Sequence, residues 1–128
     1  MVLFIEPETS LISLQQSFHQ VYPFLSIRFY KKSISTSGTM EQVWMDEHLC
    51  LKDVSTRSHL HGVIELHYWD KVSMVEQVFQ RVIGIGVQVF RKHGLEWIET
   101  SGSDSLTLEE QNEMGMEASK ALLNGIMY

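Results

Sequence analysis

The sequence predicts an α+β fold in which a β-α-β-β unit occurs twice in tandem. Three observations carry this prediction. Apolar runs of strand length alternate with stretches whose apolar residues recur at helical spacing. The order of these elements is the same in residues 1–58 as in residues 59–128. Finally, a chain of 128 residues with 44% hydrophobic composition can form a core without disulfide or metal support.

We therefore expect a single domain over residues 1–128. Its two pseudo-repeats, about 1–58 and 59–128, are expected to form one antiparallel or mixed sheet with the helices packed on one face. A ferredoxin-like or β-grasp-like arrangement is the nearest familiar architecture.

The first unit begins with a short strand followed by a helix. The apolar run at residues 2–5 ends before Pro7, as expected for a strand. Helical spacing starts at Ser10, and either Thr9 or Ser10 can cap this helix with a side-chain oxygen. Pro23 ends the helix. The apolar face of the helix is predicted to consist of Leu11, Leu14, Phe18 and Val21.

Two strands complete the first unit. Apolar and polar residues alternate through residues 24–32, which predicts a half-buried strand. Residues 33–39 are rich in serine and threonine and are expected to form a loop. A second strand is predicted over residues 40–45.

The second unit repeats this order. Residues 62–68 predict a strand, and Asp70 or Ser73 is expected to cap the next helix. Ser73 and Glu76 have the spacing of a capping box. The predicted apolar face of this helix contains Val72, Val75, Phe79 and Val82.

The second unit ends with a hairpin and a longer helix. Residues 85–92 and 95–100 predict two strands joined by a turn at His93–Gly94. Asp104, Ser105 or Thr107 is expected to start the final helix, and Thr107 and Glu110 again have capping-box spacing. The matched positions of the two units include Phe18 with Phe79, Val21 with Val82, Trp44 with Trp97, and residues 49–53 with residues 106–110.

The net charge and the cysteine content indicate which kinds of partner and which cellular compartment to expect. The formal net charge of −6 does not favour phosphate backbones, so no nucleic-acid partner is expected. The N-terminus lacks the pattern of a secretory signal, and no apolar run is long enough for a membrane span. The single cysteine, Cys50, is flanked by leucines and predicts an unpaired thiol in a reducing compartment. We expect a cytoplasmic protein without membrane contact.

The segment "VSMVEQVFQRVIGIGVQVFRKHGLEWIETSGSDSLTLEEQN" (residues 72–112) resembles a family of small bacterial α+β proteins common in Bacteroidetes. Its usual pattern is a helix, a strand like "VQVFRKSG", a tryptophan-containing strand and "TLEEQN". The segment "YPFLSIRFY" (residues 22–30) is similar to that family's "FPFLKIEFF" strand. The resemblance implies the fold but no activity, so no catalytic residue is carried over. The chain departs from the pattern at "HLH" (residues 59–61), where polar or acidic residues are usual.

A histidine-rich segment is the candidate metal site. Its possible ligands are His59, His61, Glu65 and His67, which share one face if the segment is a strand. Two histidines and a carboxylate suit zinc or iron. Tandem β-α-β-β units also occur in glyoxalase-type metal enzymes. A small metal-dependent enzyme or metal-binding domain is therefore the alternative function, although a solvated histidine-rich junction explains the same pattern.

Basic residues at the ends of two matched strands are the candidate anion site. They are Arg28, Lys32, Arg91 and Lys92. If the two units pair about a pseudo-dyad, these side chains could gather and bind an anion or an acidic partner. Lysine and arginine at strand ends also serve solubility and discourage edge pairing.

The C-terminal segment is the candidate partner-binding surface. Its apolar residues are Met114, Met116, Leu122, Leu123 and Ile126. Methionine-rich surfaces adapt to varied partners, and an apolar tail is a plausible docking or dimerisation element. Gly115 lies in the middle of this helix and lowers its stability, which indicates that another segment or molecule packs closely against the helix at this position.

No acid, base and nucleophile converge in the sequence pattern, so an enzyme is not favoured and no cofactor is predicted. We expect a non-enzymatic protein-interaction or adaptor module of a bacterial cytoplasmic system. Its partner is expected to be another protein or a second copy of the chain.

Overall fold

The structure is a computed structural model that describes residues 1–127, with side chains described through Gly125. It is an α+β fold, as predicted. The elements are β1 (Val2–Ile5), α1 (Leu11–Val21), β2 (Leu25–Ile34), β3 (Met40–Trp44), α2 (Leu51–Val54), β4 (Gly62–Glu65), α3 (Val72–Ile83), β5 (Gly86–His93), β6 (Glu96–Glu99), a short 3-10 turn (Ser101–Ser103) and α4 (Leu108–Met127).

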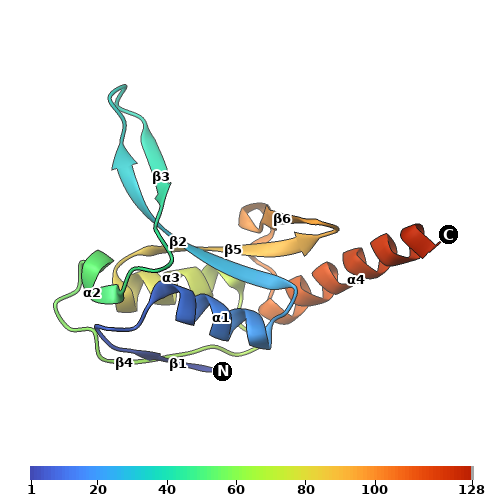
Figure 1. The fold of residues 1–128 in the computed structure, drawn as a ribbon, viewed down its shortest axis with the longest axis horizontal. Coiled ribbons are helices and arrows are strands. Elements are labelled where there is room, and N and C mark those ends of the chain that lie inside the picture. The colour runs from blue at the N-terminus through green and yellow to red at the C-terminus, as the bar shows by residue number, and fades with distance from the viewer. Residues whose placement is uncertain (128) are drawn as a thin grey trace.

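The strands form two antiparallel sheets instead of the single sheet that we predicted. The larger sheet has four strands in the order β3-β2-β5-β6, while β1 pairs only with β4. Figure 1 shows the reason: α1 and α3 lie between the four-stranded sheet and the β1–β4 pair. The helices therefore keep β1 and β4 away from the strands of the four-stranded sheet.

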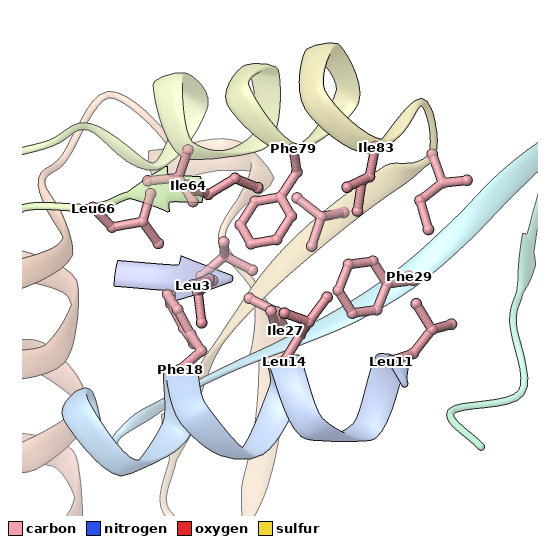
Figure 2. Close-up of a cluster of buried hydrophobic side chains, with 14 of the residues drawn as sticks. Leu3, Leu11, Leu14, Phe18, Ile27, Phe29, Ile64, Leu66, Phe79 and Ile83 are labelled. Carbon is pink, nitrogen blue, oxygen red and sulfur yellow. The ribbon is translucent and has the colours of Figure 1, made fainter. Parts of the chain in front are cut away.

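The core lies between α1, α3 and the inner faces of both sheets (Figure 2). Leu11, Leu14 and Phe18 of α1 are buried as predicted. Val21 is not buried: 49% of the residue is exposed, and the neighbouring Tyr22 is buried instead. The helix ends at Val21, so the helical spacing no longer determines which side chain faces the core.

Two of the three predicted helix caps are confirmed. Ser10 caps α1 by accepting a hydrogen bond from Ser13 N at 3.3 Å. Thr107 and Glu110 form a reciprocal capping box, each backbone N–H donating to the other's side chain at 3.1 Å. The cap at Asp70 or Ser73 is wrong: α3 starts after Lys71, and Ser73 N donates to Asp104 O at 2.9 Å.

The first residues of α1 and α3 are each hydrogen-bonded to a segment that comes later in the chain. Leu11 N donates to Leu49 O at 2.9 Å, and Val72 N donates to Leu106 O at 3.0 Å. These bonds satisfy backbone N–H groups that a helix cannot satisfy internally at its first turn. Shortly after these acceptors, Leu51 and Leu108 begin α2 and α4, and both side chains are fully buried.

Two parts of the chain extend beyond this body. Figure 1 shows the tip of the β2–β3 hairpin projecting on one side and the end of α4 on another. Strand β2 continues to Ile34, so the predicted loop is shortened to residues 35–39. Among the described helices, none combines the length and hydropathy needed to cross a bilayer.

The close approach expected at Gly115 is made by the chain itself. A methyl group added at Gly115 would lie 2.7 Å from Phe24 Cβ and 3.0 Å from Phe24 O. Phe24 O is a backbone atom and Phe24 Cβ is bonded directly to the backbone, so a side-chain rotation cannot move either atom away. Gly115 therefore lets α4 pack against the residue that precedes β2.

We expect Gly115→Ala to destabilise the protein by about 1–3 kcal/mol, the usual cost of overpacking, although alanine is the better helix former by about 1 kcal/mol. Urea unfolding followed by circular dichroism would measure this. Gly125→Ala is the matched control, because nothing lies within 4 Å of the added methyl group at that position. Equal or greater stability of Gly115→Ala would contradict this packing.

Candidate functional site

The four-stranded sheet has one face covered by α-helices and one face without an α-helix among the described residues, which we call the open face. Side chains alternate along β2, so Ile27 faces the core while Ser26 and Arg28 face the other way. Figure 1 shows α1 and α3 on a single side of this sheet. Within the described residues, no α-helix covers the opposite face.

Aromatic and cationic side chains gather on this open face at two places. Arg28 Cζ lies 4.4 Å from the ring centroid of Trp44, and Trp44 lies 5.7 Å from Phe90. Farther along, Lys92 Nζ lies 5.0 Å from the ring centroid of Trp97. Both distances fall within the range of cation–π contacts.

The Trp97 ring also reaches the helix at the far edge of β2. Its centroid lies 5.9 Å from that of His19, in an edge-to-face arrangement. His19 Nδ1–H in turn donates to Leu25 O at 2.8 Å. This contact fixes His19 against the first residue of β2 and closes one end of the open face.

A groove of about 530 Å³ lies between α1 and this edge of the sheet. We call it the β2 groove. It is lined by Ile12, Gln15, Gln16, His19, Ser26, Ile27, Arg28, Glu47, Phe90 and Trp97. Its volume is within the range of about 300–1,000 Å³ typical of ligand sites, and its lining combines apolar rings with a few polar groups.

The β2 groove runs along a stretch of β2 that is paired with β5 on one side and has no strand partner on the other. Strand β3 pairs only with Tyr30–Ile34, whereas β5 pairs with Leu25–Tyr30 on the other side of β2. The edge of β2 from Leu25 to Phe29 is therefore without a strand partner in the described part of the chain. Phe29 O accepts Met45 N at 2.9 Å at the end of this stretch.

The predicted metal ligands do not converge. His67 Nε2 lies 3.3 Å from Glu65 Oε1, and His67 Nδ1 lies 3.5 Å from Asp70 Oδ2. His59 and His61 are exposed in the connection that precedes β4. Among the residues that the structure describes, no group of three or more histidine, cysteine, aspartate or glutamate side chains is arranged to hold a metal ion.

The four basic residues are separated by the sheet register. Arg28 lies opposite Gln88, and Lys32 lies near the projecting end of β2 opposite Gln42. At the other end of the sheet, Lys92 pairs with Trp97. Arg91 faces the covered side, where its Nη1 donates to Gln111 Oε1 at 2.7 Å. Of the four, only Arg28 lines the β2 groove.

Part of the predicted C-terminal partner-binding surface packs against other residues of the same chain. Met114 Sδ lies 3.6 Å from Arg91 Nη1, and Met116 and Leu122 are half-buried. Leu123 is 58% exposed on the part of α4 that extends from the body (Figure 1). Ile126 lies outside the residues whose side chains are described. Partner binding at this end of α4 stays a prediction.

The sequence patterns do not predict the β2 groove. The alternation through residues 24–32 identifies Ser26 and Arg28 as outward-facing, and this was the available signal. The open edge depends on where β3 begins to pair, and the proximity of His19 to Trp97 depends on the sheet order. Neither feature is encoded in a local pattern.

Comparisons with protein families, curated proteins and solved structures found no match to this chain. The family resemblance of residues 22–30 and 72–112 therefore stays a prediction.

A partly buried carboxylate lies on α3, outside the β2 groove. Burial, followed by the nearby charges of Asp104 and Glu99, raises the pKa of Glu76 to about 7. Glu76 Oε1 is buried and has no hydrogen-bond partner among the described residues. The charged form of Glu76 is therefore disfavoured in the folded state.

Because the folded-state pKa of Glu76 lies above its unfolded value, the contribution of Glu76 to the stability of the protein should fall as pH rises from about 4.5 towards 7. We expect Glu76→Gln to be more stable than the wild type at pH 8. The advantage should shrink at pH 5, where the wild-type carboxyl is protonated in the fold. Thermal unfolding at both pH values measures it, and an advantage independent of pH would contradict this cause.

Proposed function

We propose that the chain is a protein-interaction module of a bacterial cytoplasmic system and that it binds a segment of a partner protein in the β2 groove. The observation that carries this proposal is a groove of about 530 Å³ that runs beside an unpaired strand edge and opens onto an aromatic sheet face.

The lining of the groove supports a protein ligand. Trp97 and Arg28 are of the residue types that are enriched among the strongest contributors to protein interfaces. Phe90 and Ile12 add apolar surface, while Gln15 offers an amide for hydrogen bonding. Together these groups suit a peptide with mixed apolar and polar side chains.

Charge adds a preference within the groove. The Arg28 guanidinium is held against Trp44, so part of its ordering cost is met before a ligand arrives. An acidic side chain of the ligand can pair with it. Glu47 also lines the groove and disfavours a second acidic group near its own carboxylate.

We also propose that the two halves are copies of one β-α-β-β unit. Matching hydrogen bonds support this proposal, since Leu51 N donates to Thr9 O at 2.8 Å and Leu108 N donates to Asp70 O at 2.9 Å. The isolated bridges Ser10–Cys50 and Lys71–Thr107 occupy matching places as well. The ferredoxin-like or β-grasp-like arrangement stays a prediction.

To test the proposed function, a phage-displayed library of linear random peptides would be selected on the purified protein. Each enriched peptide would then be titrated against the wild type, Trp97→Ala and Arg28→Ala. We expect Trp97→Ala to weaken binding by about tenfold or more, which corresponds to about 1.4 kcal/mol. Isothermal titration calorimetry would measure the dissociation constants.

Trp69→Ala is the matched control, because Trp69 is an exposed tryptophan that does not line the β2 groove. Its affinity for the peptides should equal that of the wild type, and circular dichroism would show that all variants fold. The proposal fails if no peptide is enriched, or if the groove variants bind every peptide as well as the wild type does.

A further inference from the structure

We propose that the partner segment binds as an extended strand added to the free edge of β2, with its backbone hydrogen-bonded to Ile27. This inference rests on the proposed function of the β2 groove and names the conformation and contacts of its ligand.

The backbone direction of Ile27 follows from its neighbours along the strand. Leu25 O accepts His19 Nδ1–H and Phe29 O accepts Met45 N, so both carbonyls point away from β5. In a β-strand, the backbone groups of alternate residues point to the same side. The N–H and C=O of Ile27 must therefore point away from β5 too, towards the groove.

The burial of Ile27 sets a condition on this pairing. Its side chain is packed in the core, with only 1% of the residue exposed, yet Ile27 lines the β2 groove. Because the exposed fraction counts the backbone as well as the side chain, the N–H and C=O of Ile27 lie beneath other groups that line the groove, and a peptide strand must displace these groups to pair with them. Outside the sheet ladders, no described hydrogen bond involves this N–H or C=O.

The free edge exists because β3 turns away from β2 early. After Met45 the chain runs to α1, where Glu47 O accepts Ile12 N at 2.8 Å and Leu49 O accepts Leu11 N. Among the described residues, no strand therefore pairs with Ile27 on the side where a longer β3 would lie. Natural proteins usually shield such an edge with charge, proline or a covering element.

One peptide residue placed opposite Ile27 could exchange two hydrogen bonds with it, as in a hydrogen-bonded antiparallel pair. The side chains before and after that residue would then point to the open face, beside Ser26 and Arg28. Ser26 is small and lies opposite Phe90 in the register. A large apolar side chain at this position can reach over Ser26 towards Phe90 and Trp97.

The inferred ligand is therefore an extended segment with a large apolar side chain at one outward position and an acidic side chain at the position two residues away. Backbone pairing supplies affinity, and the alternate side chains supply specificity, which is the general mode of strand addition.

The experiment uses a peptide selected from the library together with ¹⁵N-labelled full-length protein. Amide hydrogen exchange would be followed by NMR at Ile27 and at Lys31, with and without the peptide. Lys31 is the matched control, because it lies on the same edge of β2 but is already paired with Val43 of β3. In the free protein, the Ile27 amide should exchange faster than the Lys31 amide.

Saturating peptide should slow exchange at Ile27 by about tenfold or more and leave Lys31 unchanged. A second measurement would scan the peptide with single N-methyl groups, which remove one backbone donor at a time. We expect loss of binding at alternate positions only, since the other N–H groups of an added strand point to solvent.

Two results would overturn strand addition while leaving the proposed function intact. In the first, the peptide is sensitive to Trp97→Ala but does not change exchange at Ile27. In the second, the Ile27 amide is protected in the free protein and loses protection on dilution, so a second copy of the chain occupies the edge. Failure of every peptide to depend on the groove overturns both proposals.

Discussion

The antiparallel pairing of β2 with β5 is the interaction on which the rest of the structure depends. Its register places Ile27 opposite Val89 and Phe29 opposite Val87, so apolar side chains from both strands enter the core together. A shift of one residue in either strand would turn its apolar set outward. The same register directs Arg28 and Phe90 to the open face, so core and candidate site are determined by one alignment.

The helix termini explain why this sheet has an open edge. The first N–H groups of α1 need acceptors, and the chain after β3 supplies them through Leu49 O and Glu47 O. Meeting that requirement draws the chain away from β2 before β3 has covered it. The segment that follows β3 is hydrogen-bonded to the first turn of α1, so it does not pair with residues Leu25–Phe29 of β2.

Most elements could be predicted from the sequence because their signals are local. The spacing of Leu11, Leu14 and Phe18 identifies α1, and Thr107 with Glu110 identifies the start of α4. The capping box at Ser73 was wrong because the N–H of Ser73 is satisfied by Asp104 O, a contact that sequence spacing does not reveal. Pairing of β1 with β4 also depends on how distant segments meet, which explains the error of one sheet instead of two.

The site was harder to predict than the fold for a related reason. Residues that looked functional, such as His59 and His61, are exposed in a connection, whereas the groove is made of ordinary residue types. Arg28 was singled out for its charge, but its neighbours His19 and Trp97 come from α1 and β6. Only the assembled sheet brings them within reach of one another.

An edge that can accept a partner strand can also accept the wrong one. When the groups that cover it move aside, the unpaired stretch of β2 offers identical molecules a template for irregular association and, at high concentration, for precipitation. The net charge of −6 opposes such encounters by mutual repulsion, and this protection weakens as salt rises or as pH approaches the isoelectric point near 5.4. The colloidal behaviour of the free protein is thus tied to the same few backbone groups that make its edge available.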